Sequence, residues 1–232
     1  RMTTYKKMKI DDWVKTYFAV EPTHESGAIF SYDTSATHTL AALVQRLSGT
    51  SLLEYLRPRL LDPIGFSKEA VWLSCPMGIN QGGSGLICKT RDIAKFALTL
   101  LNEGCFQGKQ LLPKEYVKQA ISKQIDTSMQ PVIEERQGYG YQIWRCTHNG
   151  FVCYGLGGQL AICLPDKKFV LVTTADTQGY PTGTPGIFEV FWKTVYPYLS
   201  EGVLEENEEE YMALHNKLEQ LRICLLYTSD AA

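Results

Sequence analysis

The chain has 232 residues, of which 44% are hydrophobic, 11% aromatic and 21% charged. This composition excludes a disordered, collagen-like or coiled-coil protein and supplies enough apolar side chains for a buried core. Lysine and arginine together number 23 against 25 acidic residues, which gives a net charge of −2. Nucleic-acid binding is therefore not expected, because it normally requires a basic excess. No apolar run approaches the ~18 residues of a membrane span, so no membrane span is expected.

The cysteines and the chain ends bear on where the protein resides and on how much of it is present. Seven cysteines without a C-x-x-C pair favour reduced, buried thiols and a cytoplasmic protein. The chain begins with Arg1 and carries no signal-peptide pattern, so we expect the natural N-terminus, which could hold such a signal, to be missing. Residues 223–232 fit no structural pattern, and our interpretation is a non-native tail.

Helical patterns dominate the first part of the chain, about residues 9–135. Apolar residues at three- and four-residue steps, capping residues and helix-ending prolines and glycines together predict four helices. The second of them begins at a capping box of Ser51 and Glu54 and is expected to end near Arg57, because Pro58 follows. The four predicted helices cover residues 34–49, 51–57, 90–104 and 113–122.

After Arg136 the hydrophobic period becomes strand-like. Four strands are predicted within GYGYQIW, GFVCYG, QLAICL and KFVLVTTAD. Their short connections favour antiparallel pairing, because parallel neighbours need long crossovers. A helix that starts at Thr184 and Pro185 closes this part, which covers residues 136–199. Helices, then a meander, then a helix predict an α+β fold, and we expect a single domain over residues 1–222.

The last segment differs in kind, because residues 201–210 contain six glutamates. Apolar residues then recur at heptad spacing. Our interpretation is a solvated helix that docks by this one apolar stripe, and a dimer-forming helix is the alternative. The oligomeric state stays open. The stripe consists of Tyr211, Leu214, Leu218 and Leu221.

Metal, cofactor and phosphate sites find no support in the residue spacing. The four histidines and seven cysteines form no metal-ligand grouping, so we expect neither a metal nor another cofactor. The glycines of QGGSGL lack the lysine of a phosphate-binding loop. They predict instead a loop whose backbone approaches another part of the chain closely.

Patterns for a nucleophile are also missing. No serine has a lysine three residues later, and G-x-S-x-G is absent. Only Thr3 and Thr4 have a lysine at that step, and we interpret their surroundings as a solvated basic stretch. A thiol nucleophile, Cys146 or Cys153 near His148, is an alternative, although buried inert thiols are commoner.

Four phrases in order resemble the serine β-lactamase-related hydrolases, the superfamily of class C β-lactamases, D,D-peptidases and β-lactamase-like esterases. GAIFSYDTSATHTLAALVQRLSGTSLLEYLRPRLLDPIGF is similar to the region around that family's motif tyrosine. The other phrases are NQGGSGLICKTRDIAKFALTLLNEGCFQGKQLLPKEYV, YGYQIW and YGLGGQLAICLPDKKFVLVTTAD, and together they cover about residues 9–198. The resemblance implies a β-lactamase/transpeptidase-like fold, with an antiparallel sheet flanked by helices, a helical subdomain, and an incomplete N-terminus.

The resemblance also implies a set of functional residues. Such enzymes use the serine of Ser-x-x-Lys as nucleophile, and its lysine and the motif tyrosine share proton transfer. Tyr32 matches the tyrosine, although a merely half-buried structural tyrosine is the alternative. Thr34 stands where the family commonly has a substrate-binding asparagine, which favours esters or peptides over β-lactams. Gly157 and Gly158 are expected to line the cleft and shape the oxyanion hole, and no cation there can grip a substrate carboxylate.

The function implied is part of a serine hydrolase that forms an acyl-enzyme on esters, amides or β-lactam-like rings in small-molecule or peptide-like substrates. The resemblance places Ser-x-x-Lys upstream of Arg1, together with two strands of the sheet, so this chain alone is expected to be inactive. A noncatalytic substrate-binding or sensor module of the same fold is the alternative. An exposed apolar sheet edge is expected near residues 169–176 or along the final helix.

Overall fold

The computed structural model describes residues 11–202 and 205–221. It divides the chain into two units, Arg1–Leu199 and Ser200–Ala232. Thr3, Thr4 and the tail 223–232 lie outside the described residues.

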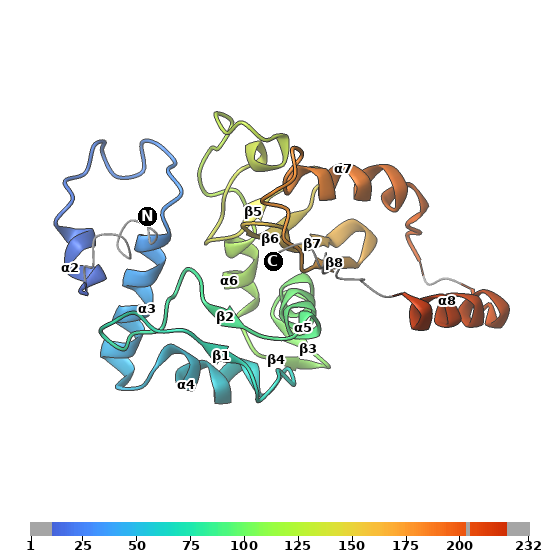
Figure 1. Cartoon of the computed structure of the whole chain (residues 1–232), viewed down its shortest axis with the longest axis horizontal. Helices are drawn as coiled ribbons and strands as arrows, with labels where there is room; N and C mark the ends of the chain where they lie inside the picture. Colours follow the sequence, from blue (N-terminus) through green and yellow to red (C-terminus); the bar gives the residue numbers. More distant parts are fainter. Residues whose placement is uncertain (1–10, 203–204, 222–232) are drawn as a thin grey trace, which may run out of the picture. The chain divides into compact units, whose positions relative to one another are not determined.

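The helices of the first unit confirm the predicted pattern. Capping holds their ends: the Asp33 carboxylate accepts a hydrogen bond from the Ser35 N–H at 2.7 Å, and Ser51 and Glu54 form the expected capping box. The helices of the first unit (Figure 1) are α2 (Trp13–Phe18), α3 (Thr34–Ser48), α4 (Leu52–Leu56), α5 (Thr90–Leu101), α6 (Lys114–Ala120) and α7 (Pro185–Thr194).

The second α-helix ends at its C-cap residue Arg57, as predicted, but the chain does not leave the helical path there. A π-helical turn, Arg57–Leu61, continues the coil through Pro58. Proline stands in the first positions of this turn, where its fixed φ angle suits the helical path. The wider turn is closed across the proline by a hydrogen bond of 2.8 Å from the Asp62 N–H to the Arg57 carbonyl.

The predicted antiparallel meander is confirmed. Strands β5 to β8 form one sheet in chain order, and each pairs antiparallel with the next. Two short hairpins, β1–β2 and β3–β4, stand beside it in the helical part. The strands are β1 (Val71–Trp72), β2 (Leu86–Ile87), β3 (Cys105–Phe106), β4 (Lys109–Gln110), β5 (Trp144–Arg145), β6 (Phe151–Gly155), β7 (Gln159–Leu164) and β8 (Phe169–Thr173).

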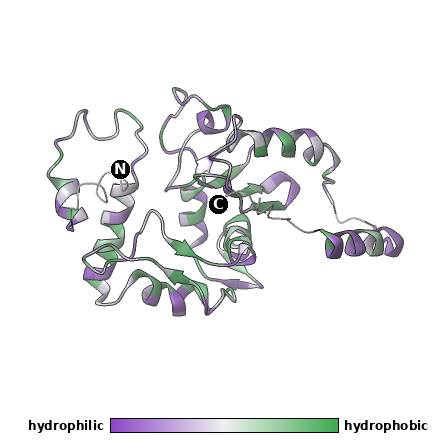
Figure 2. Cartoon of the chain, viewed as in Figure 1, coloured by the Kyte–Doolittle hydropathy of each residue, from purple (hydrophilic) through white to green (hydrophobic). Residues whose placement is uncertain are grey.

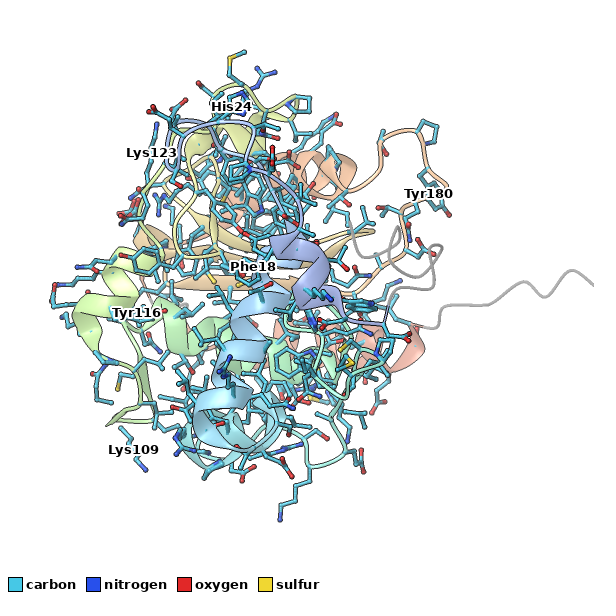
Figure 3. All side chains as sticks on the ribbon, turned by 90° about the vertical axis from the view of Figure 1, so that its left-hand side faces the viewer. Phe18, His24, Lys109, Tyr116, Lys123 and Tyr180 are labelled. Carbon is cyan, nitrogen blue, oxygen red and sulfur yellow. The ribbon has the colours of Figure 1, made fainter. Side chains whose placement is uncertain are left out.

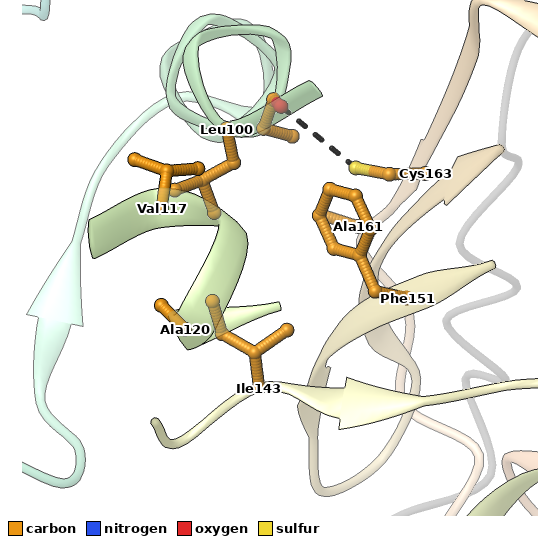
Figure 4. Close-up of a cluster of buried hydrophobic side chains, with 8 residues drawn as sticks. Leu100, Val117, Ala120, Ile143, Phe151, Ala161 and Cys163 are labelled. Carbon is orange, nitrogen blue, oxygen red and sulfur yellow. Dashed lines mark hydrogen bonds between the residues drawn. The ribbon is translucent and has the colours of Figure 1, made fainter. Parts of the chain in front are cut away.

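Helices cover both faces of the sheet. Neighbouring residues on a strand point to opposite faces, so each strand contributes side chains to both. On β6, Phe151 faces α5 and α6, where it packs in a cluster with Leu100 and Val117 (Figure 4). The next residue, Val152, faces α7 and its side chain Phe188. Figure 2 shows the hydrophobic residues concentrated on the central strands and on parts of the helices that cover them. The core is therefore divided into two layers by the sheet.

Strand β8 lies at the edge of the sheet. This agrees with the exposed edge expected near residues 169–176. Within the described residues β8 pairs only with β7, and its side chains are partly exposed. A hollow of about 490 Å³ lies where α5 meets this strand, with Leu98, Phe106, Val170 and Val172 among its lining residues. The edge thus offers both unpaired backbone and apolar side chains.

The second unit contains the predicted C-terminal helix, α8 (Glu208–Gln220). The Asn207 side chain caps it by accepting a hydrogen bond from the Glu210 N–H at 3.1 Å, and three glutamates in the first turn suit the positive end of the helix dipole. The four side chains of the heptad stripe are each 56–61% exposed.

The glycine loop QGGSGL, between β1 and β2, packs closely on α3, as its sequence predicted. A Cβ atom on Gly82 would lie 2.5 Å from the Thr37 carbonyl oxygen and 2.6 Å from the Ala41 Cβ. A Cβ atom on Gly83 would lie 2.6 Å from the Thr34 methyl group. Only glycine fits at these two positions, and the loop fixes the first half of α3 from one side.

Replacement of Gly82 by alanine is expected to destabilise the first unit by about 1–3 kcal/mol, because the added methyl group overpacks the loop against α3. Urea unfolding monitored by circular dichroism measures the change. Gly179→Ala is the matched control, because no atom lies within 4 Å of its Cβ position and its backbone angle is ordinary. Equal midpoints for the two variants would contradict the close packing.

Candidate active site

Tyr32 lies just before α3 and is held by two aromatic side chains. Its ring stacks on Trp144 of β5, with centroids 6.1 Å apart and an interplanar angle of 20°. The ring of Tyr139 meets it at 88°, with centroids 6.5 Å apart. Trp144 is buried, whereas Tyr32 remains 55% exposed. The phenol is therefore supported from behind and open to a ligand in front.

Phe30 completes this group. Its ring centroid lies 4.8 Å from that of Tyr139 and 5.2 Å from that of Trp144, and the last two are 4.7 Å apart. We call Phe30, Tyr32, Tyr139 and Trp144 the aromatic cluster. Such tilted and edge-to-face pairs stabilise by about 0.5–1.5 kcal/mol each beyond their burial. The cluster joins the approach to α3 to a segment more than one hundred residues later in the sequence.

A pocket of about 140 Å³ opens beside Tyr32, and we call it the Tyr32 pocket. It joins the same two segments, and the Thr37 hydroxyl fixes their spacing by donating a hydrogen bond of 2.8 Å to Gln142 Oε1. Its lining residues are Phe30, Ser31, Tyr32, Asp33, Ala36, Thr37, Tyr139 and Gln142.

Two phenols, Tyr32 and Tyr139, and one carboxylate line the Tyr32 pocket. Burial, with a smaller contribution from the neighbouring Tyr32, raises the pKa of Tyr139, so its hydroxyl stays protonated at neutral pH. Asp33 is the charged residue of the lining, and neither lysine nor arginine lines the pocket among the described residues. A protonated Tyr139 hydroxyl can donate a hydrogen bond but is unsuited to act as a base.

The other residues expected at the site lie apart from this pocket. Thr34 is the first residue of α3, and its methyl group packs toward Gly83 instead of lining the pocket. Gly157 and Gly158 form the buried tip of the β6–β7 hairpin, with φ of 87° and 98°. Trp144 connects the two regions, because its ring centroid lies 6.4 Å from that of Tyr154, next to this tip. The structure thus brings Tyr32 near the sheet through its ring partners, Tyr139 and Trp144.

The tip itself is shaped by hydrogen bonds from the end of β8 and from the segment that follows it. The carbonyl of Gly157 accepts a hydrogen bond from the Thr177 N–H at 2.9 Å, and that of Gly158 accepts one from the Thr173 hydroxyl at 2.8 Å. A Cβ atom on Gly158 would lie 2.7 Å from Ile187 Cδ1 of α7. Both left-handed angles and this crowding require glycine here.

The sequence did not identify Phe30, Asp33, Tyr139 or Gln142 as site residues. The structure shows that Asp33 is the N-cap of α3. Tyr139 and Gln142 belong to the phrase GYGYQIW, which predicts a strand, yet only Trp144–Arg145 is a strand there. The irregular backbone, with Gln142 at φ of 65°, carries the preceding residues to the pocket. The closely spaced aromatic residues of that phrase were the sequence feature that could have indicated a site wall.

The cysteine alternative finds unfavourable surroundings. Burial raises the pKa of Cys153 to about 11 and that of Cys146 to about 12, so both remain protonated thiols at neutral pH. The His148 ring lies against Trp192 and Tyr196, with centroids 4.3 and 4.1 Å away. A protonated thiol is a poor nucleophile, and this histidine is packed as an aromatic neighbour.

Two further properties concern only residues 11–202 and 205–221. No three histidine, cysteine, aspartate or glutamate side chains there converge as metal ligands would. None of the helices in this part of the chain combines the length and apolar character needed to cross a bilayer.

An antiparallel meander between α7 on one face and α5 with α6 on the other, and a tyrosine ahead of α3, define a β-lactamase/transpeptidase-like hydrolase fold. The chain belongs to the Beta-lactamase family, whose model matches residues 2–186. The expected α+β fold and superfamily are therefore confirmed. No curated protein sequence matches the chain at a significant level.

Three solved structures illustrate the fold. A protein from Bacillus anthracis described as a 6-aminohexanoate-dimer hydrolase is 25% identical, with a TM-score of 0.60 over 88% of this chain and 48% of its own. A β-lactamase from Mycobacterium bovis is 19% identical, with a TM-score of 0.56 over 75% and 67%. An octameric penicillin-binding protein homologue from Pyrococcus abyssi is 19% identical, with a TM-score of 0.57 over 81% and 48%. The chain thus spans about half to two-thirds of these proteins.

His38 of α3 is a buried titratable group beneath the site. The ring is 1% exposed and meets the edge of Trp13 of α2, with centroids 5.2 Å apart. Burial lowers its pKa, and the backbone of Asn80 only partly offsets this effect. The folded state therefore favours the neutral imidazole.

We predict that His38 makes the first unit less stable in mild acid. Below about pH 6.5 the unfolded chain takes up a proton on this histidine more readily than the folded chain does. The contribution of His38 to the free energy of unfolding is therefore fully present above about pH 6.5 and is lost as the pH falls toward the lowered pKa. Urea unfolding at pH 7.5 and 5.5 measures this loss, which His38→Leu should reduce. The exposed His24→Leu is the control and should behave as the original. An unchanged loss in His38→Leu would refute the assignment.

Proposed function

We propose that this chain is the tyrosine-bearing part of a serine hydrolase that acts through an acyl-enzyme on esters, amides or β-lactam-like substrates. The observation that carries the proposal is the phenol of Tyr32, which is exposed at the rim of a pocket and stacked on the buried Trp144. Membership of a hydrolase family supports it. A rigidly supported, open side chain is what a proton-transfer group requires.

The proposed chemistry needs a nucleophile that the 232 residues do not contain as Ser-x-x-Lys. We place that motif in a segment of the parent protein outside this chain, in keeping with relatives about twice as long. The serine oxygen attacks the substrate carbonyl carbon, and its proton passes to Tyr32 or the motif lysine. The leaving group departs with that proton, and water then cleaves the acyl-enzyme by the same route. A tyrosine has an ordinary pKa of about 10, so it acts as a base only beside a cation such as this lysine.

The β6–β7 tip is proposed to supply the oxyanion donor. Within the described residues the N–H of Gly157 donates to no acceptor, although the residue is buried. A buried N–H without a partner costs free energy unless a ligand satisfies it. We assign it to the developing oxyanion of the substrate, with Gly158 giving the backbone the room to turn there.

Edge strand β8 supports the same proposal. Its free side is proposed to pair with strands from the segment that carries Ser-x-x-Lys, which would cover the hollow beside Val170 and Val172. Pairing would satisfy the unpaired backbone groups and bury the apolar side chains. It would also bring the serine to the sheet that carries Trp144.

The test restores the upstream coding sequence and measures hydrolysis of a p-nitrophenyl ester. Tyr32→Phe in the restored protein is expected to lower kcat/KM by about 10²–10⁴-fold, because the ring still stacks on Trp144 but no longer transfers a proton. Tyr141→Phe is the control: this exposed tyrosine lies outside the Tyr32 pocket and should leave turnover unchanged.

Three outcomes would oppose the proposal in different ways. Full activity in Tyr32→Phe would remove Tyr32 from the chemistry. Loss of activity after iodoacetamide treatment would favour a thiol nucleophile, Cys146 or Cys153. No turnover and no labelling by a fluorescent penicillin, together with substrate binding, would favour the noncatalytic sensor module instead.

A further inference from the structure

The walls of the Tyr32 pocket are largely aromatic. Tyr32 and Tyr139 stand at 88° to each other, so the two rings form a corner. Phe30 adds a third ring, tilted by 51° to Tyr139 with centroids 4.8 Å apart. Ring faces carry partial negative charge, and a corner of several rings is a favourable environment for a positively charged alkylammonium group.

The negative charge of Asp33 at this corner also favours a cationic ligand. The exposed carboxylate of Asp33 lines the pocket, and its Oδ1 accepts the capping hydrogen bond from the Ser35 N–H at 2.7 Å. Its Oδ2 accepts no hydrogen bond from the described residues, so this oxygen is available to a ligand. No lysine or arginine lines the pocket in the described part of the chain, so no cation there offsets the repulsion between Asp33 and a ligand carboxylate.

The size of the pocket limits what it can take. Its volume of about 140 Å³ corresponds to roughly four or five water molecules at ~30 Å³ each. A trimethylammonium group, or a primary ammonium with its neighbouring methylenes, fills such a space. A whole substrate does not, so the pocket suits one end group of a molecule whose remainder extends past Tyr32.

We propose that the Tyr32 pocket binds the alkylammonium end of the substrate, which makes amino-esters or amino-amides the preferred substrate class. The link to turnover rests on the proposed hydrolase function. Binding of the cation does not, because it needs no nucleophile.

The probes are three molecules of nearly the same shape and different charge: choline, the neutral 3,3-dimethyl-1-butanol, and the anionic 3,3-dimethylbutyrate. Each is titrated into the 232-residue chain and followed by the NMR signals of the tryptophan indoles. Choline is expected to bind about tenfold more tightly than the neutral alcohol, and the anion most weakly. Equal affinities for choline and the alcohol would overturn the proposal.

Asp33→Asn isolates the contribution of the charge, because asparagine caps a helix as well as aspartate does. It should reduce choline binding severalfold and leave binding of the alcohol unchanged. Asp12→Asn is the matched control, since Asp12 also caps a helix, accepting from the Lys15 N–H at 2.9 Å, but does not line the pocket. Unchanged choline binding in Asp33→Asn would overturn the role of the carboxylate.

Tyr139→Leu tests the aromatic corner, and it should weaken choline more than the alcohol, whereas Tyr139→Phe should retain binding. The same titrations on the protein restored with Ser-x-x-Lys separate two explanations. Loss of choline binding there would show that the pocket receives the motif lysine, which would overturn the assignment to substrate. Retained choline binding without ester turnover would support the cation site and sink the hydrolase proposal alone.

Discussion

The packing of Phe30 and Tyr32 against Tyr139 and Trp144 is the interaction on which the candidate site depends. These rings tie the approach to α3 to the start of the central sheet, across more than one hundred residues of sequence. Because Trp144 is buried, its position is set by the core and not by solvent. Tyr32 is thereby given a fixed orientation although it lies outside any helix or strand.

The rest of the first unit supports this arrangement. The sheet is covered on one face by α5 and α6 and on the other by α7, so β5 and its tryptophan have little freedom to move. From the other side, the loop of Gly82 and Gly83 packs on the first half of α3. Tyr32 is 55% exposed, and Phe18 at the end of α2, which is also exposed, is labelled in Figure 3. The site is thus rigid at its base and open in front.

Local patterns predicted much of this fold, because capping boxes, glycine ends and alternating strands are decided by neighbouring residues. The Ser51 capping box and the four strands of the meander are examples. Contacts between distant segments could not be predicted: one sequence does not show that Gln142 meets Thr37. The π-helical turn through Pro58 was not predicted, because it depends on a wider hydrogen-bonded turn that residue spacing does not reveal. Tyr32 itself was found by family resemblance, and its aromatic support only by the structure.

In the proposed mechanism, Tyr32 exchanges a proton with a nucleophilic serine held beside it. The most direct measurement is a crystal structure of the restored protein after reaction with a phosphonate ester, which leaves a stable adduct on the nucleophile. We expect the adduct on the serine of Ser-x-x-Lys, with the Tyr32 hydroxyl about 2.6–3.2 Å from that serine oxygen or one water away. A phosphonate on another residue, or a Tyr32 hydroxyl beyond reach of the serine, would contradict the claim.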